Sequence, residues 1–403
     1  MIGAIIGDAA GSVYEFNNIK TTDFPFFSRG SNYTDDSVMT MAVAYWLLTD
    51  KDHTNEELEK SMVGFANSYQ CPLGGYGARF LQWLLNSGER KPYNSWGNGS
   101  AMRVSAVGWM FDTLEETERV AGISAAITHN HPEGIKGAQA TAAAIFMARN
   151  DKSKQEIKDY ITTKYGYDLN RTCDEIRPIY KYNESCQGTV PEAMIAFFDS
   201  TDFESAIRLG VSLGGDSDTL ACITGGIAEA YYKEIPEEII DGIVERLTDD
   251  FKKVLKVFYS RINYTPKYME GKLEEGKTPH YTPNHIRELK DNEIFVFGSN
   301  LAGHHGGGAA RAAMDKFGAI WGQGVGMQGQ CYAIPTMQGG VETIKPYVDE
   351  FIEFARQHTE YKFLVTRIGC GIAGFKDEEI APLFKNAKDL ENVWLPKSFI
   401  DLY

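Results

Sequence analysis

The periodicity of the apolar residues changes once along the chain, and this change is the strongest constraint on its fold. Residues 1–260 have the pattern of helices with short glycine-containing breaks, and period-2 alternation is hard to find among them. After residue 285, short apolar runs typical of buried strands alternate with helical stretches. Because the two patterns bury their apolar faces in different ways, we expect two domains.

Five segments of the first part have the composition of buried helices. They are rich in Ala, Ile and Leu, and they span residues 36–48, 115–126, 134–148, 203–209 and 220–232. Residues 151–190 are more polar and are expected to form surface helices and a loop. The first domain, residues 1–262, is therefore predicted to be all-α.

A charged segment with three prolines separates the two parts. Residues 263–285 read NYTPKYMEGKLEEGKTPHYTPNH, which is typical of a linker. Beyond it we expect strands over 293–297, 330–334 and 363–366, and helices over 309–317 and 343–358. This alternation predicts a compact α/β domain over residues 286–403.

Composition argues against several classes of protein. The chain carries 55 acidic and 40 basic residues, a net charge of −15. It lacks the basic footprint of a protein that binds the nucleic-acid backbone, so nucleic acid is a less favoured partner. The six cysteines form no C-x-x-C pair and no zinc-ligand spacing, which favours reduced structural thiols. The start MIGAIIGDAAG lacks the basic segment of a signal peptide, and no apolar run reaches the about 18 residues of a membrane span, so we expect a cytoplasmic protein without a membrane partner.

Four short motifs of the first domain carry residues that bind hard cations. They are GDAAGSVYE with Asp8 and Glu15, YTDDS with Thr34, Asp35 and Asp36, GNGSAMR at 97–103, and GGDSDT with Asp216, Asp218 and Thr219. Carboxylates beside a threonine hydroxyl are oxygen ligands that suit Mg²⁺ or Mn²⁺. Acids in these positions are also common as N-caps of helices, and each pair taken alone favours the cap.

In their order along the chain, these motifs and THNHPEG at 128–134 closely resemble the ADP-ribosylglycohydrolase family, the relatives of the dinitrogenase reductase-activating glycohydrolase. The resemblance covers about residues 1–260 and implies an all-α fold with a site for two Mg²⁺ or Mn²⁺ ions. The metal ligands would be Thr34, Asp35, Asp36, Asp216, Asp218 and Thr219. The implied reaction is hydrolysis of the glycosidic bond between ADP-ribose and a modified target, with release of ADP-ribose.

The same resemblance gives roles to further residues. Glu15 matches a mobile glutamate and would act as general acid or base, with Asp35 and Asp36 as further catalytic residues. Substrate would be bound by Asn98, Gly99, Ser100, Met102, His131 and Gly215. His129 and His131 could suggest zinc, but two histidines at i and i+2 without a nearby third ligand are more often ordinary loop residues.

Two glycine-rich loops each follow an expected strand of the second domain. FGSNLAGHHGGGAARAAM leads into a helix, an arrangement that presents main-chain N–H groups to phosphate, and TRIGCGIAGF occupies residues 366–375. The first loop is neither a Walker A loop nor a G-x-G-x-x-G turn. Either loop alone could equally be a tight turn required by packing. Together they suggest a cleft at the carboxyl ends of the strands.

Together the two loops resemble a macrodomain, an ADP-ribose-binding module with a three-layer α/β/α fold. The match, over residues 286–403, would assign ADP-ribose binding to Asn300, Gly306, Gly307, Gly308, Gly369, Gly371, Ile372, Ala373, Gly374 and Phe375. The Gly-Asp-Ile segment whose aspartate contacts adenine in many macrodomains has no counterpart here, and Asp291 is misplaced for that role.

The leading hypothesis is a metal-dependent hydrolase that removes ADP-ribose from a protein or another modified target and carries a second ADP-ribose-binding domain. One alternative is a chain of two enzymes, in which the second domain also hydrolyses an ADP-ribosyl linkage. Another is a sensor that binds ADP-ribose or NAD-derived nucleotides without turnover, which the complete set of acids argues against. The sequence leaves the linked group open among arginine, serine, a nucleic-acid base and a small metabolite.

Overall fold

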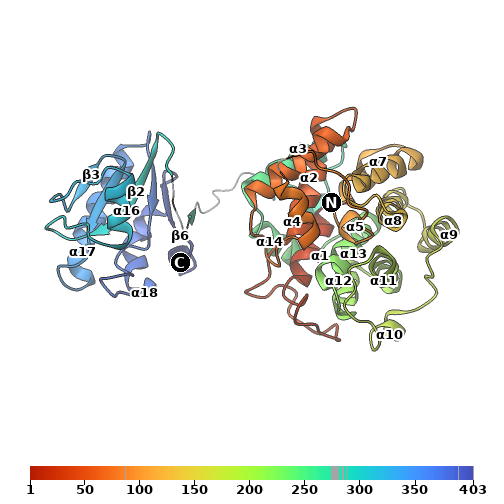
Figure 1. Cartoon of the computed structure of the whole chain (residues 1–403). Helices are drawn as coiled ribbons and strands as arrows, with labels where there is room; N and C mark the ends of the chain where they lie inside the picture. The colour runs from red at the N-terminus through yellow and green to blue at the C-terminus, as the bar shows by residue number, and fades with distance from the viewer. Residues whose placement is uncertain (87, 274–280, 284–285, 287, 389, 403) are drawn as a thin grey trace. The chain divides into compact units, whose positions relative to one another are not determined.

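The chain forms two compact units, Met1–Glu275 and Gly276–Tyr403 (Figure 1). A computed structural model describes residues 1–86, 88–273, 281–283, 286, 288–388 and 390–402. The first unit is all-helical and the second is α/β, which confirms the predicted change of fold class along the chain.

The helices of the first unit include all five that the sequence predicts, as α2, α7, α8, α12 and α13. The longer helices are α1 (Ile2–Gly11), α2 (Asp35–Thr49), α3 (Asn55–Ser68), α4 (Ala78–Leu85), α6 (Ser105–Met110), α7 (Leu114–Ala126), α8 (Pro132–Arg149), α9 (Lys154–Tyr165), α11 (Cys186–Asp199), α12 (Phe203–Ser212), α13 (Ser217–Tyr232), α14 (Glu237–Val244) and α15 (Asp249–Arg261). Single turns are formed by α5 (Gly99–Met102), α10 (Cys173–Ile176) and η1 (Lys267–Met269).

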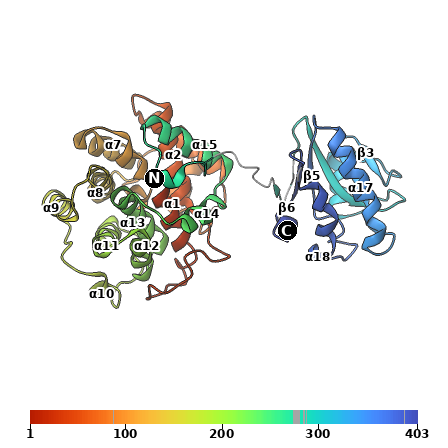
Figure 2. The same cartoon turned by 180° about the vertical axis from the view of Figure 1, so that it is seen from behind.

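Three glycines spaced four residues apart, Gly3, Gly7 and Gly11, let α1 lie directly on α13. A Cβ atom at Gly7 would stand 1.9 Å from the carbonyl oxygen of Ala221, and one at Gly11 would stand 2.5 Å from that of Ser217. Only glycine permits such an approach of two helix backbones. The C-terminal end of α1 therefore lies beside the first turn of α13, in the middle of the helical unit (Figure 2).

The second unit is built on a six-stranded sheet with the order β1-β6-β5-β2-β4-β3, in which β3 and β4 pair antiparallel and the other neighbours pair parallel. Its elements are β1 (Tyr281–Thr282), β2 (Glu293–Ser299), α16 (Gly308–Lys316), β3 (Gly326–Gln328), β4 (Cys331–Pro335), α17 (Val341–Gln357), β5 (Lys362–Val365), α18 (Asp377–Ile380), η2 (Ala381–Ala387), β6 (Val393–Pro396) and α19 (Lys397–Ile400). The three predicted strands are β2, β4 and β5, and the two predicted helices are α16 and α17. The three unpredicted strands have only two to four residues.

Alternate residues of β2 face two separate apolar cores. Ile294 and Val296 belong to a cluster that includes α17, η2 and α19. Phe295 and Phe297 belong to a second cluster that includes α16. Because neighbouring side chains of a strand point to opposite faces, helices cover both faces of the sheet, which gives three layers.

The predicted linker is shorter in the structure than in the sequence analysis. The Tyr264 ring stacks on that of Trp109 at 5.4 Å, and Met269 and Leu273 are buried in the helical core. Residues 263–273 thus belong to the first unit. The sequence did not show this, because the apolar side chains of this segment are interspersed among prolines and charged residues. Residues 281–282 form β1, and the predicted linker residues 274–280, 284 and 285 lie outside the described residues.

All six cysteines are free thiols, as predicted. Among the residues that the structure describes, the helices are too short or too polar to cross a bilayer.

Candidate active site

A cleft of about 430 Å³ opens in the first unit, and most of the predicted site residues line it. They are Glu15, Asp35, Asp36, Asn98, Gly99, Met102, Asp216, Asp218 and Thr219. The motifs that lie far apart in the sequence therefore share one site.

Two helix N-termini bring the aspartates together. Asp35 and Asp36 occupy the first turn of α2, and Asp218 occupies the first turn of α13. The Thr219 side chain is close enough to the carboxylates of Asp36 and Asp216 to lower the pKa of each, so the two acidic motifs meet at this residue. Helix N-termini stabilise negative charge, so both helices favour carboxylates at this point.

The cap interpretation holds for one acidic motif and fails for the other. Thr34 caps α2, since its hydroxyl accepts a hydrogen bond from the Asp36 N–H at 3.2 Å. Asp216 stands at the N-cap position of α13 but makes no capping bond with its side chain. Its carboxylate instead accepts a hydrogen bond from the Asn98 side-chain amide at 2.7 Å. The acids of GGDSDT are thus directed into the cleft.

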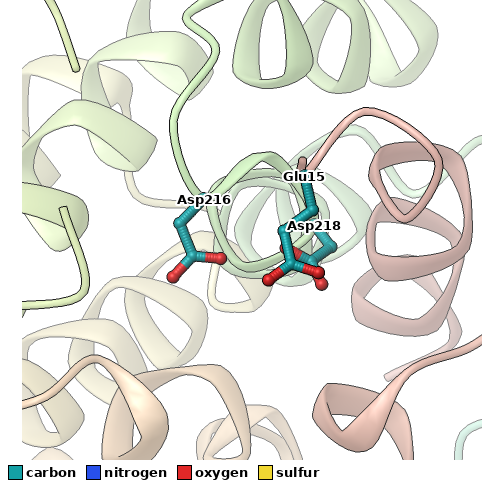
Figure 3. A group of neighbouring side chains, drawn as sticks. All are labelled: Glu15, Asp216 and Asp218. Carbon is teal, nitrogen blue, oxygen red and sulfur yellow. The ribbon is translucent and has the colours of Figure 1, made fainter. Parts of the chain in front are cut away.

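Glu15, Asp216 and Asp218 form the tightest carboxylate group, with one oxygen of each within 4.8 Å of the others (Figure 3). The packing of α1 on α13 explains how Glu15 reaches this group, because Glu15 follows α1 by four residues. Asp218 Oδ1 and Asp36 Oδ2 are buried and have no hydrogen-bond partner among the described residues. Buried oxygens of this kind require a compensating partner, and a set of oxygen donors without cysteine or histidine suits a hard divalent cation. The acidic cluster could therefore hold a metal ion.

The electrostatics of the group lead to the same conclusion. Burial, and then the charges of neighbouring carboxylates, raise the pKa values of Asp35, Asp36 and Asp218 well above their ordinary range. Burial, followed by the charge of Asp216, raises the pKa of Glu15 to about 7. A cation would remove the repulsion that raises these pKa values.

We expect the metal-free protein to lose stability as the pH rises. A carboxyl group whose pKa is raised on folding binds protons more tightly in the folded state, so its stabilising contribution is present at low pH and is lost as the pH passes the folded-state pKa. The folded-state values are about 6 for Asp8 and about 7 for Glu15, against ordinary values near 4. In EDTA the Tm should therefore be several degrees higher at about pH 5 than at about pH 8.

Thermal unfolding followed by circular dichroism measures this difference. The control adds Mg²⁺ or Mn²⁺, which should raise the Tm more at about pH 8 than at about pH 5, because protons compete with the cation for the carboxylates. A metal-free Tm that rises between these two pH values would contradict the repulsion argument.

Asp8, from the first of the four motifs, fixes the start of α2. Its buried carboxylate accepts hydrogen bonds from the Thr34 N–H at 2.9 Å and the Ser37 N–H at 3.0 Å, and also from the Ser37 hydroxyl. It thus holds the turn that carries Asp35 and Asp36. A single aspartate within the otherwise apolar IGAIIGDAAG was the signal that could have identified it.

Four predicted site residues do not line the cleft. Ser100 is buried and donates to the Gly134 carbonyl at 2.7 Å, and Gly215 is held by the side chain of Asn18. Thr34 caps α2, as described above. The expectation that His131 lines the cleft is wrong, because its ring caps α8 by accepting from the Glu133 N–H at 3.1 Å, whereas His129 lines the cleft.

The cleft also has a basic part, which the sequence analysis missed. Arg79, Arg103 and His129 line it around the ring of Tyr93, with the Arg79 guanidinium 4.9 Å from the ring centroid. Gly99 connects this part to the carboxylates, because it follows Asn98 and lies against the ring of His129. The lining therefore offers carboxylates for a cation and cations for an anion.

Glu15 is held from two sides at the mouth of the cleft. The Tyr182 hydroxyl donates to Glu15 Oε1 at 3.3 Å, and the Tyr182 ring stacks on that of the exposed Phe16 at 6.4 Å. On the other side, Gly74 leaves room for the carboxylate, since a Cβ there would stand 2.9 Å from Glu15 Oε2.

The model of the ADP-ribosylglycohydrolase family matches residues 1–264, about two thirds of the chain and all four acidic and glycine motifs. The chain belongs to the ADP-ribosylglycohydrolase family. An uncharacterized protein of Archaeoglobus fulgidus is 32% identical over an alignment that covers 61% of this chain and 90% of that protein. The ADP-ribosylhydrolase ARH3 of Mus musculus is 27% identical, with 59% of this chain and 84% of the relative covered.

The solved structure of an ADP-ribosylglycohydrolase-related protein complex matches with a TM-score of 0.53 and 20% identity, over 65% of this chain and 95% of the other. This likeness supports the fold of the helical unit. Membership of the family confirms the predicted ADP-ribosylglycohydrolase enzyme class. The family model ends at residue 264, so the macrodomain resemblance of the second unit stays a prediction.

The two glycine loops of the second unit lie side by side, as the sequence suggests. They follow β2 and β5, which are parallel neighbours. A Cβ atom at Gly298 would stand 3.3 Å from the Gly369 nitrogen, and one at Gly307 would stand 3.3 Å from Ile372 Cδ1. The bidentate pair of Arg367 with Asp377, at 3.0 and 2.8 Å, closes the second loop.

The side chain of Asn300, which is predicted to bind ADP-ribose, makes its hydrogen bonds within the first loop. Its side-chain oxygen accepts from the His304 N–H at 3.1 Å, and its amide donates to the His304 carbonyl at 2.9 Å. Both polar groups of the side chain are used inside the first loop. The ring of Phe375 packs against the core of the unit. Of the predicted loop residues, those that are exposed are Gly306, Gly308, Gly371, Ile372 and Gly374.

Proposed function

We propose that the helical unit hydrolyses the glycosidic bond between ADP-ribose and a modified target and releases ADP-ribose. Two Mg²⁺ or Mn²⁺ ions would be held by Asp35, Asp36, Asp216, Asp218, Thr34 and Thr219. The observation that carries this proposal is the pair of buried carboxylate oxygens without a partner, Asp36 Oδ2 and Asp218 Oδ1, in a cleft lined by family motifs. Such ions, when bound, orient hydroxyl groups and make water a stronger nucleophile.

Glu15 is the residue that handles the proton in this proposal. Its carboxyl group is partly exposed at the cleft mouth, and its pKa of about 7 allows it both to accept and to donate a proton near neutral pH. The Tyr182 hydroxyl holds one oxygen in place and leaves the other free for a water molecule or a leaving group. Asp35 and Asp36 would support the reaction as ligands.

The basic part of the cleft provides for the diphosphate of ADP-ribose. Arg79 and Arg103 supply positive charge there, and the single turn α5, which begins at Gly99, lies beside it with its first main-chain N–H groups. In ADP-ribose the anionic diphosphate lies several bonds from the distal ribose. The diphosphate would lie at the basic part of the cleft, and the ribose would lie at the carboxylates.

Release of free ADP-ribose from a panel of substrates tests this function. The panel contains ADP-ribose linked to arginine, to serine, to a nucleic-acid base and to a small metabolite, and mass spectrometry detects the product. We expect turnover of at least one substrate with Mg²⁺ or Mn²⁺ and loss of turnover in EDTA. Full activity in EDTA would contradict the metal-dependent mechanism.

For the second unit we propose binding of ADP-ribose without metal, through the main-chain N–H groups of the two glycine loops. A binder on the same chain would raise the local concentration of a modified target at the catalytic cleft to the order of mM. The adjacency of the loops and the exposure of Gly371 at their tip support this proposal.

Gly371→Glu should weaken binding of ADP-ribose by the second unit without unfolding it. A Cβ at Gly371 meets no atom within 4 Å, so the fold accommodates a side chain, whereas the added carboxylate repels a diphosphate. We expect a loss of affinity of about tenfold or more in calorimetry in EDTA. For a macromolecular substrate, KM should rise and kcat should stay nearly unchanged.

Gly371→Ala is the matched control, because it adds the Cβ without the charge, and it should bind more tightly than Gly371→Glu. Both proteins are measured in the Asp218→Asn background, so that the catalytic cleft contributes equally to the two measurements. Equal affinity of the wild type and Gly371→Glu would contradict the role of this loop.

A further inference from the structure

Arg103 is a buried arginine without a carboxylate partner in the part of the chain that the structure describes. It is 1% exposed and follows the single turn α5. Its Nη2 donates to the Ser124 carbonyl at 2.8 Å and to Thr128 Oγ1 at 2.9 Å, at the C-terminal end of α7. A guanidinium is favourable at a helix C-terminus, but burial of its charge still requires a reason beyond capping.

The hydrogen bonds of Thr128 determine where the proton of His129 lies. Thr128 is fully buried, and its Oγ1 lies 2.7 Å from His129 Nδ1. Because Arg103 donates to this oxygen, the hydroxyl proton of Thr128 needs an acceptor, and among the described residues His129 Nδ1 is the one within reach. If Nδ1 carried a proton instead, the buried hydroxyl would keep an unpaired donor, which is costly. The proton of the neutral imidazole therefore belongs on Nε2.

His129 Nε2 is directed at the cleft. A Cβ atom at Gly99 would stand 3.1 Å from it and one at Gly97 would stand 3.5 Å from it, so the ring edge lies against the glycine turn that lines the cleft. No hydrogen-bond acceptor for Nε2 is found among the described residues, although the side chain is almost wholly buried. An N–H donor that faces a cleft without a protein acceptor can donate to a ligand atom that accepts a hydrogen bond.

We infer that Arg103 and Thr128 are positioning residues that hold His129 as the neutral Nε2–H tautomer, so that the ring offers a hydrogen-bond donor to an anionic oxygen of the substrate. This inference rests on the proposed function for the identity of the ligand, since the diphosphate of ADP-ribose supplies that oxygen. The arrangement of the tautomer does not depend on the ligand, because it follows from contacts within the protein.

The surroundings of the ring favour its neutral form. Burial, and then the charges of Arg103 and Arg79, lower the pKa of His129 well below its ordinary value. A neutral ring has one donor and one acceptor, and the Thr128 hydroxyl decides which nitrogen is which. Besides the charge that it supplies to the cleft, the buried arginine thus acts on the substrate through the side chains of Thr128 and His129.

Nuclear magnetic resonance of the full chain with ¹⁵N-labelled histidine tests the tautomer directly. The chain has eight histidines, and loss of one set of signals in His129→Gln assigns the residue. We expect Nε2 to carry the proton in the ligand-free wild type at neutral pH. A proton on Nδ1, or on both nitrogens, would overturn the inference. This result comes from the wild-type protein and does not depend on whether a substituted protein folds.

Two variants then test the chain of hydrogen bonds from Arg103 through Thr128 to His129, which we call the relay. Thr128→Val removes the hydroxyl with little change of shape and should move the proton to Nδ1 or give a mixture of tautomers. It should also raise KM for the substrate on the order of tenfold, with a smaller change in kcat. Thr128→Ser keeps the hydroxyl and should match the wild type in both measurements. A purely structural role would move the Tm of Thr128→Val but leave the tautomer unchanged, which would overturn the inference.

The two levels of the proposal fail in different ways. If the wild type hydrolyses no substrate of the panel, the proposed function fails, and the relay is then tested by the tautomer and by the affinity for ADP-ribose in calorimetry. If the wild type hydrolyses ADP-ribosylated substrate but Thr128→Val retains both the tautomer and the KM, the proposed function stands and the relay is wrong.

Discussion

Asp218→Asn should abolish hydrolysis and, in the same protein, raise the thermal stability of the metal-free state. Asp218 is 4% exposed, and its Oδ1 is buried without a partner. The asparagine keeps the shape of the side chain but removes one of several buried charges that repel each other, so the metal-free fold should gain at least about 1 kcal/mol. If Asp218 binds the cation as proposed, its loss should reduce kcat by about 10³-fold or more.

Three measurements on one protein check this prediction: turnover of an ADP-ribosylated substrate, binding of Mg²⁺ or Mn²⁺ by calorimetry, and the Tm with and without metal. Glu234→Gln is the matched control, because it makes the same exchange of carboxylate for amide at an exposed position outside the cleft. It should leave all three quantities at their wild-type values.

The combination of results decides between the mechanisms. A lower metal-free Tm in Asp218→Asn would show that its carboxylate stabilises the fold as an ordinary structural group. Turnover that persists at the wild-type rate would remove the proposed role of the helical unit and would favour the chain of two enzymes, with the second unit as the active part.

The sequence predicted the composition of the site better than its geometry. The order of the motifs and its resemblance to the family point to Asp35, Asp36, Asp216 and Asp218, whereas each pair of acids taken alone favours helix caps. The motifs do not reveal which carboxylates come closest. Glu15 joins Asp216 and Asp218 because three glycines bring α1 onto α13, and such a contact between distant helices has no local signature.

The choice between His129 and His131 shows the same limit at smaller scale. Both histidines occupy one motif, two residues apart, and the local pattern fits either. The structure separates them because Pro132 begins α8, which makes His131 the capping residue, while His129 is drawn inward by Thr128 and Arg103. Arg103 lies 25 residues before Thr128, its hydrogen-bond partner, so the motif alone could not reveal this contact.

In the second unit, a continuous apolar run was enough to predict the core strand β2, because both of its faces are buried. The short strands β1, β3 and β6 carry too few residues to show a period. The linker prediction failed at its start for a related reason: three apolar contacts, those of Tyr264, Met269 and Leu273, outweigh a composition that is otherwise typical of a linker.

Glu15→Gln should lower kcat by about 10²- to 10⁴-fold and leave metal affinity near that of the wild type. The amide keeps the size of the side chain and its contact with the Tyr182 hydroxyl, but it cannot carry a proton between water and a leaving group. The position of Glu15 makes this a demanding test, because one of its oxygens lies within 4.8 Å of oxygens of Asp216 and Asp218 and could bind the cation directly.

Calorimetry with Mg²⁺ or Mn²⁺ and steady-state kinetics on the same preparation separate the two roles of Glu15. A residue that handles the proton leaves the metal affinity intact, whereas a ligand weakens it in parallel with kcat. Tyr182→Phe is the matched control, since it removes the hydrogen bond to Glu15 and preserves the stack on Phe16, so kcat should fall much less than in Glu15→Gln. Joint loss of metal binding and turnover in Glu15→Gln would make Glu15 a ligand, and the proton would then have to be carried by another group of the cleft. The partial exposure of Glu15 at the mouth, beside fully buried aspartates, is the reason to expect the first result: a group that exchanges protons with substrate and solvent needs access to both, and a ligand does not.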